Sequence, residues 1–124
     1  MNKPFSVLII EDDTWFAQQQ TRILETAGFI VRHAVDGLAG IEAIDTSTPD
    51  AVILDIFLPG PNALVLLHEM QSHADLASIP VVICTNSVAV LPQTSLTAYG
   101  VKAVLDKATM RPHDLVAAIK RELI

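Results

Sequence analysis

Acidic side chains follow two short apolar runs of the sequence, at points where we expect buried strands to end. Asp55 comes directly after the run at 51–54 (AVIL), and the triplet at 11–13 (EDD) comes directly after the run at 7–10 (VLII). An ionised carboxylate at the end of a buried strand is costly unless its charge is compensated. Because the carboxyl ends of parallel strands meet at one edge of a sheet, the two runs predict a small anionic pocket.

We expect the carboxylates of Asp12, Asp13 and Asp55 to converge in this pocket. Two carboxylates about 5 Å apart repel each other by roughly 3 kcal/mol at an effective dielectric constant near 20. A cation or protons must therefore accompany them, and a few oxygen ligands suit Mg²⁺, which keeps several of its waters. With the metal bound, Asp55 can act as an oxygen nucleophile toward phosphorus. The plainer alternative for the acidic residues after the first run is that they cap the following helix.

Two further predicted strand ends carry side chains that suit phosphoryl transfer. Thr85 follows the run at 81–84 (VVIC), and Lys107 lies just after the run at 103–105 (AVL). A hydroxyl donor and a compact cation both stabilise charge on phosphoryl oxygens. A lone threonine is usually a turn residue and a lone lysine is usually solvated, so the argument depends on the four strand ends taken together.

Apolar runs of strand length alternate with segments of helical spacing. The runs lie at 5–10, 29–34, 51–55, 80–85 and 101–105. This alternation predicts an α/β fold with one parallel, doubly wound sheet of five strands and five helices covering both its faces. Segment 29–34 mixes charged with apolar residues, so we expect it to be an edge strand.

Helix boundaries are marked by glycine and proline. Gly28 and Gly100 suit helix C-termini, and Pro112 suits the first position of a helix. The fourth helix is the weakest, because β-branched residues and a proline precede it. We expect this helix only over 91–99, after a mobile loop at 86–92.

The composition of the chain argues against several classes of protein. The 124 residues suit one domain over 1–124, and 51% hydrophobic with 18% charged residues argues against disorder. The net charge of −6 argues against nucleic-acid binding. We see no apolar run near the ~18 residues of a membrane span and no signal-peptide pattern, so we expect a cytoplasmic protein without membrane contact. The single cysteine, Cys84, is interpreted as a small core residue.

The ordered motifs resemble those of the receiver domain of two-component response regulators, within the chemotaxis-regulator-like superfamily. The resemblance covers essentially the whole chain. It implies a flavodoxin-like fold of strand order 2-1-3-4-5. The matching stretches are 7–13, 51–55 with Pro59, 79–85, and Gly100-Val101 with Lys107 seven residues past the glycine.

The resemblance also implies a role for each site residue. Asp55 would accept a phosphoryl group from the phosphohistidine of a histidine kinase or from a phosphotransfer protein. Asp12, Asp13 and Asp55 would hold Mg²⁺ together with the backbone carbonyl of Phe57. Thr85 and Lys107 would bind the phosphoryl group. A downstream protein or output domain would bind the face formed by the fourth helix, fifth strand and fifth helix, so the domain would signal rather than act as an enzyme.

The sequence departs from the family at several switch positions. Ala108 follows Lys107 where the family most often has proline, so we expect a trans bond there, because a non-proline cis bond costs about 2.5–4 kcal/mol. Val104 stands where many members carry the aromatic residue of the switch. Asn86 replaces a small residue after Thr85.

Two aromatic residues near the site lead to hypotheses of their own. Phe57 lies where polar side chains in the family often position the attacking water. With Asn86 it is expected to slow hydrolysis, the plainer alternative being that Phe57 only covers its loop. Trp15 falls on the polar side of the first helix, beside Gln18, Gln19 and Arg22. It is a candidate residue for docking the kinase or phosphotransfer partner, unless it packs locally.

Three rival functions remain open from the residues. A degenerate or constitutive receiver would bind partners without a working switch. An aspartyl-phosphate hydrolase would need a second aspartate at the position of Phe57. A flavin carrier would need a hydroxyl-rich loop in place of the acidic triplet at 11–13, which would repel an anion.

Overall fold

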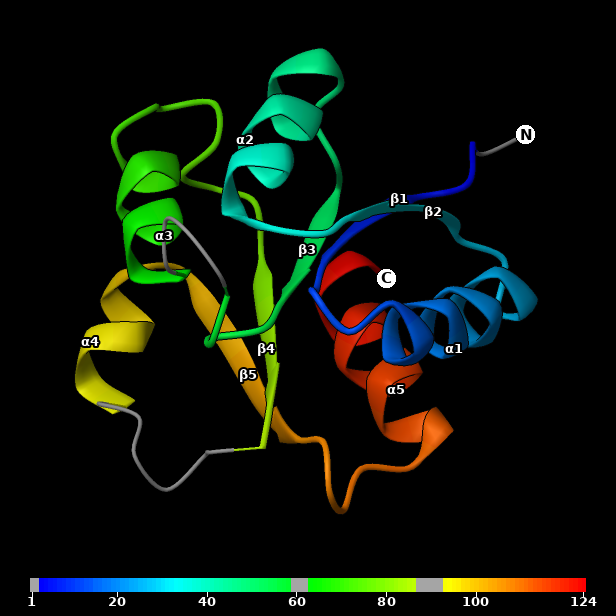
Figure 1. Ribbon diagram of the computed structural model, residues 1–124. Coiled ribbons are helices and arrows are strands. Elements are labelled where there is room, and N and C mark those ends of the chain that lie inside the picture. The colour runs from blue at the N-terminus through cyan, green and yellow to red at the C-terminus, as the bar shows by residue number, and fades with distance from the viewer. Residues whose placement is uncertain (1–2, 59–62, 87–92) are drawn as a thin grey trace.

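Five strands and five helices alternate along the described part of the chain, as the apolar runs predict (Figure 1). The computed structural model describes residues 3–58, 63–86 and 93–124. In chain order the elements are β1 (Ser6–Ile10), α1 (Thr14–Thr26), β2 (Ile30–Ala34), α2 (Gly37–Thr46), β3 (Ala51–Leu54), α3 (Ala63–Gln71), β4 (Val81–Thr85), α4 (Gln93–Ala98), β5 (Val101–Asp106) and α5 (Pro112–Leu123).

The strands form one parallel sheet in the order β2-β1-β3-β4-β5. This confirms the doubly wound α/β fold and the order 2-1-3-4-5, with β2 at an edge. Every residue of β3 and β4 is buried, whereas β2 is buried only at its last residue. Burial on both faces is the reason that the central strands are continuously apolar in the sequence.

Alternate residues of the strands serve two separate cores, one on each face of the sheet. Figure 1 shows α1 and α5 on one side of the sheet and α2, α3 and α4 on the other. The core under α1 and α5 takes Val7, Ile9, Ile53, Val82 and Cys84 from the strands, and the other core takes Leu8, Ile10, Val52, Leu54 and Ile83. The period-2 alternation of side chains along each strand therefore determines to which of the two cores a residue belongs.

The helix boundaries follow the predicted signals. Gly28 and Gly100 have φ of 100° and 83°, left-handed values that favour glycine directly after a helix. Pro112 is the first residue of α5. Helix α4 lies within the predicted 91–99, and the predicted mobile loop lies, from residue 87 onward, outside the described residues.

The parallel arrangement brings the carboxyl ends of β1, β3, β4 and β5 to one edge of the sheet, where the predicted site residues follow. Among the described residues, none of the helices combines the length and apolar character that crossing a membrane requires.

Candidate functional site

Asp55 is held at the carboxyl end of β3 by three hydrogen bonds. Its backbone N–H donates to the carbonyl of Ile10 over 3.0 Å. Its Oδ1 accepts from the backbone N–H of Phe57 at 3.1 Å, and its Oδ2 accepts from Lys107 Nζ at 3.1 Å. Asp55 is 8% exposed. The carboxylate is therefore fixed in position while still reachable from solvent.

Glu11 is the most buried carboxylate of the site, at 2% exposure. It follows the last residue of β1, forms an ion pair with Lys107 Nζ, and accepts from the backbone N–H of Asp13 at 3.1 Å. Burial raises the pKa of Glu11 to about 7, and the Asp55 charge adds to this rise, although Lys107 and the Asp13 N–H oppose it. Sequence reasoning did not assign Glu11 a role, although its place directly after Ile10 was a usable signal.

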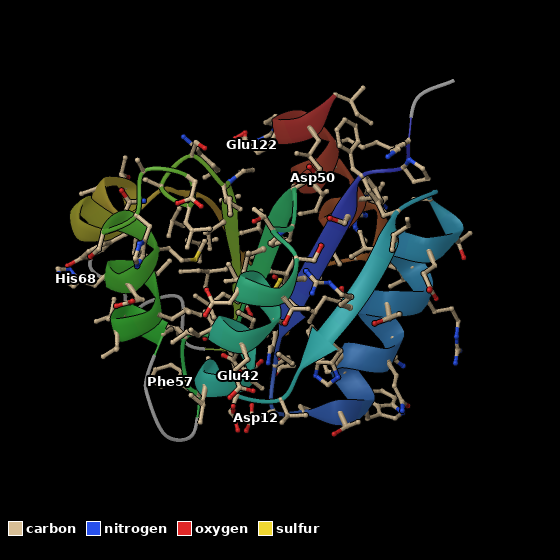
Figure 2. The ribbon with its side chains drawn as sticks, turned by 90° about the horizontal axis from the view of Figure 1, so that it is seen from above. Asp12, Glu42, Asp50, Phe57, His68 and Glu122 are labelled. Carbon is tan, nitrogen blue, oxygen red and sulfur yellow. The ribbon has the colours of Figure 1, made fainter. Side chains whose placement is uncertain are left out.

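Asp12 completes a group of three carboxylates. One oxygen each from Glu11, Asp12 and Asp55 lie within 4.8 Å of one another. Asp12 is exposed, whereas the other two are buried. Figure 2 shows Asp12 and Phe57 at one end of the sheet and Asp50 at the opposite end. The predicted anionic pocket is therefore present at the carboxyl edge.

Asp13 has a different position from the one expected. It is the N-cap of α1, and its Oδ1 accepts from the backbone N–H of Phe16 at 3.0 Å. An N-cap carboxylate satisfies one of the free N–H groups of the first helical turn. The predicted set of Asp12, Asp13 and Asp55 thus differs from the group that the structure brings together, in which Glu11 takes the third place.

Lys107 extends from the end of β5 into this pocket. Its ammonium bonds to Asp55, pairs with Glu11, and lies 4.6 Å from the centre of the Phe16 ring, a cation–π contact. Burial by itself lowers its pKa, but the Glu11 and Asp55 carboxylates outweigh this and raise the pKa of Lys107 overall. The lysine therefore stays charged at the place where an anion would meet Asp55.

Thr85 ends β4 at the same edge of the sheet. It is fully buried, and its carbonyl accepts from the backbone N–H of Lys107 at 3.0 Å. The preceding residue, Cys84, belongs to the core as predicted, and burial raises the pKa of its thiol to about 12. Cys84 therefore stays a neutral thiol, while Thr85 stands beside the site.

The loop between β5 and α5 has Ala108, and not proline, after Lys107. The bond between Lys107 and Ala108 is trans, as predicted, because the described residues contain no cis peptide. The Ala108 N–H, which proline would lack, donates to Asp106 Oδ1 at 2.8 Å. Val104 is half-buried and packs against the core under α2, α3 and α4.

Phe57 and Trp15 are exposed, at 57% and 67%. Phe57 extends from the site loop and Trp15 from the second position of α1. The exposure of Trp15 agrees with its predicted place on the polar side of α1 and is not that of a buried packing residue. Asn86 is exposed as well.

The residues of the pocket fit a magnesium ion. Three oxygen donors face one neighbouring ammonium, so one more positive charge would reduce the repulsion among them. All three donors are hard carboxylate oxygens, the ligands that Mg²⁺ prefers. Asp12 is exposed, which leaves room for the water ligands that this ion keeps.

Comparisons with known proteins identify relatives of this chain. The probable transcriptional regulatory protein TcrX of Mycobacterium tuberculosis is 32% identical over 99 residues, which are 79% of this chain and 42% of TcrX. The transcriptional regulatory protein CseB of Streptomyces avermitilis is 31% identical over 123 residues, 94% of this chain and 48% of CseB. This chain therefore spans less than half the length of these relatives.

Solved structures share the whole fold. A putative response regulator from Chloroflexus aurantiacus has a TM-score of 0.89 at 29% identity, covering 98% of each chain. The receiver domain of the sensor histidine kinase PA1611 from Pseudomonas aeruginosa, solved with magnesium in its active-site cleft, has a TM-score of 0.85 at 18% identity, covering 97% of this chain and 98% of that one.

The family model for the response regulator receiver domain matches residues 7–120, nearly the whole chain. The same stretch contains the parallel sheet except Ser6, and it contains the carboxylate group of Glu11, Asp12 and Asp55. On this match, the chain belongs to the family of response regulator receiver domains.

Proposed function

We propose that this protein is a phosphoacceptor switch in which Asp55 receives a phosphoryl group from a phosphohistidine. The observation that carries the proposal is the placement of Asp55 Oδ2, 3.1 Å from Lys107 Nζ and in one group with Glu11 and Asp12. A carboxylate beside a fixed cation and a candidate metal site can attack phosphorus and have the product's charge balanced.

The transfer is a displacement at phosphorus. An Asp55 oxygen forms the new P–O bond, the P–N bond to the donor imidazole breaks, and that nitrogen takes up a proton. Magnesium, held by Asp12, Asp55, Glu11 and the backbone carbonyl of Phe57, would neutralise charge on the transferring oxygens. The Lys107 ammonium and the Thr85 hydroxyl would bind the phosphoryl oxygens.

Phosphorylation adds about −1.5 to −2 charge to a pocket that already carries three carboxylates. Lys107 would exchange part of its contact with Asp55 and Glu11 for the phosphoryl oxygens. Because Lys107 follows β5 and its N–H bonds to the carbonyl of Thr85 at the end of β4, this exchange would bias the α4–β5–α5 face. That face is our proposed site for a downstream protein or output domain.

Val104 makes this switch differ from that of family members with an aromatic residue at the same position. It is half-buried on β5, where many members of the family have an aromatic ring. The signal must therefore pass through the β4–β5 pairing or the loop after β5 rather than through an aromatic rotamer. We also propose that residues 1–124 form one receiver domain and that it acts in the cytoplasm, with a histidine kinase or phosphotransfer protein as donor.

Acetyl phosphate supplies the direct test. The protein is incubated with acetyl phosphate and Mg²⁺, and the phosphorylated form is separated on a phosphate-affinity gel. We expect a shifted band that disappears in Asp55→Asn and persists in Asp75→Asn, which removes one exposed carboxylate away from the site. A wild type without a shifted band, together with retained partner binding, would favour a constitutive receiver, the second candidate that Val104 keeps open.

A further inference from the structure

A hollow of about 300 Å³ lies between α2 and α3, away from the phosphoacceptor pocket. The two helices lie side by side on one face of the sheet (Figure 1). Five lining residues are apolar and three are polar. The apolar ones are Ile41, Ile44, Leu66, Met70 and Leu76, and the polar ones are Asp45, Glu69 and His73. Its volume is at the lower end of the range for small-molecule sites.

A second compartment of about 160 Å³ continues this hollow at its polar end. The two share the side chains of Ile44, Asp45, His73 and Leu76, and the second one adds Thr48 and Asp75. The combined space is therefore amphiphilic: Ile41 and Leu76 are its partly exposed apolar side chains, and Asp45 and Asp75 supply two carboxylates at its polar end.

No lysine or arginine occurs in the sequence between Arg32 and Lys102, whereas this stretch includes Asp45, Glu69 and Asp75. Arg32 itself is engaged elsewhere, since its guanidinium donates to the carbonyls of Ala43 and Ser47 at the end of α2. The carboxylates of the hollow therefore lack a permanent cationic partner among its lining residues, although His73 Nε2 lies 3.3 Å from Glu69 Oε1.

We propose that this hollow binds a small organic cation, a primary amine that carries an aryl or branched alkyl group. The apolar body packs against Ile41 and Leu76, the partly exposed apolar residues of the lining, and the ammonium occupies the end lined by Asp45 and Asp75. Charge complementarity selects a cation over an anion of the same shape. A protein partner would need about 800 Å² of contact, far more than this hollow offers. The site is independent of the phosphoacceptor function.

Phenethylammonium is a suitable probe, and its effect can be followed by methyl NMR of isoleucine, leucine and methionine. We expect saturable shifts confined to the lining methyl groups, with a dissociation constant on the order of 1 mM. Asp45→Asn with Asp75→Asn should weaken binding by about five- to tenfold.

Glu42→Gln with Glu122→Gln is the matched control. It removes two carboxylates, one from α2 and one from α5, that do not line the hollow, and it should leave the affinity unchanged. Absence of saturable shifts would overturn the proposal. Binding of 3-phenylpropionate as tight as that of phenethylammonium would also overturn it. So would an equal loss of affinity in the two double variants, or saturable shifts that only a cationic peptide produces.

Discussion

Lys107 Nζ lies 3.1 Å from Asp55 Oδ2 and pairs at the same time with the buried Glu11. A single ammonium thus serves two carboxylates that lie at the ends of neighbouring strands, with a third, Asp12, in the same group. Without a metal the pocket holds more negative than positive charge. The burial of Glu11, with a smaller contribution from the Asp55 charge, explains why its pKa rises to about 7.

Glu11 should make the metal-free protein less stable as the pH rises. Its pKa increases from 4.5 to about 7 on folding, so the folded state holds the proton more tightly. The resulting stability is complete below pH 4.5 and is lost as the pH rises to about 7, a change on the order of 1–3 kcal/mol. Urea unfolding in chelator at pH 5 and pH 8 measures it. Glu11→Gln should flatten the difference and exposed Glu25→Gln should not; an unchanged difference in Glu11→Gln would contradict the account.

Asp12 should act as a Mg²⁺ ligand and Asp13 as the N-cap of α1, and mutations should distinguish the two roles. Asp13→Ala should cost about 1 kcal/mol of stability, because the Phe16 N–H loses its acceptor, but should leave Mg²⁺ affinity nearly unchanged. Asp12→Ala should reduce Mg²⁺ affinity without destabilising the metal-free fold. Calorimetric titration with MgCl₂ and urea unfolding report the two effects. Asp13→Asn keeps the cap and removes the charge, so a large loss of Mg²⁺ affinity in this variant would restore Asp13 as a ligand.

Gln20 is a buried amide whose removal should stabilise the protein. It is 4% exposed on the inner side of α1, and its Oε1 has no hydrogen-bond partner among the described residues. Leaving a buried polar group unpaired costs about 1–3 kcal/mol. Gln20→Met, which has a similar shape, should raise the free energy of unfolding by about 1 kcal/mol. The exposed neighbour Gln19→Met should change it little, and a destabilised Gln20→Met would show that the amide has a partner in solution.

Phe57 should prolong the phosphorylated state. Its ring is exposed, two residues after the acceptor, and has no group to orient a water molecule. Phe57→Asn should accelerate loss of the phosphoryl group by about tenfold or more, and Phe57→Leu should not. The decay of the shifted gel band after removal of acetyl phosphate gives both rates. Loss within seconds in the wild type would refute this role for Phe57.

Much of the fold was predictable because each central strand is apolar throughout, and because Gly28, Gly100 and Pro112 mark the ends of α1 and α4 and the start of α5. The edge of the sheet where Asp55, Thr85 and Lys107 meet followed from their positions just after the strands. The role of Glu11 was not predicted, because its burial depends on Lys107, which only the folded chain brings beside it. Likewise, sequence alone did not separate Asp13 as cap from Asp12 as candidate ligand, since both follow the same strand.

The identity of the phosphorylated residue decides whether Asp55 is the phosphoacceptor. Borohydride reduces an aspartyl phosphate to homoserine, so peptide mapping after reaction with acetyl phosphate and Mg²⁺ locates the acceptor. The account predicts homoserine at position 55, and none in protein treated without acetyl phosphate. Homoserine at Asp12 or Asp13 instead, or an unmodified peptide at Asp55 in protein that carries phosphate, would contradict it.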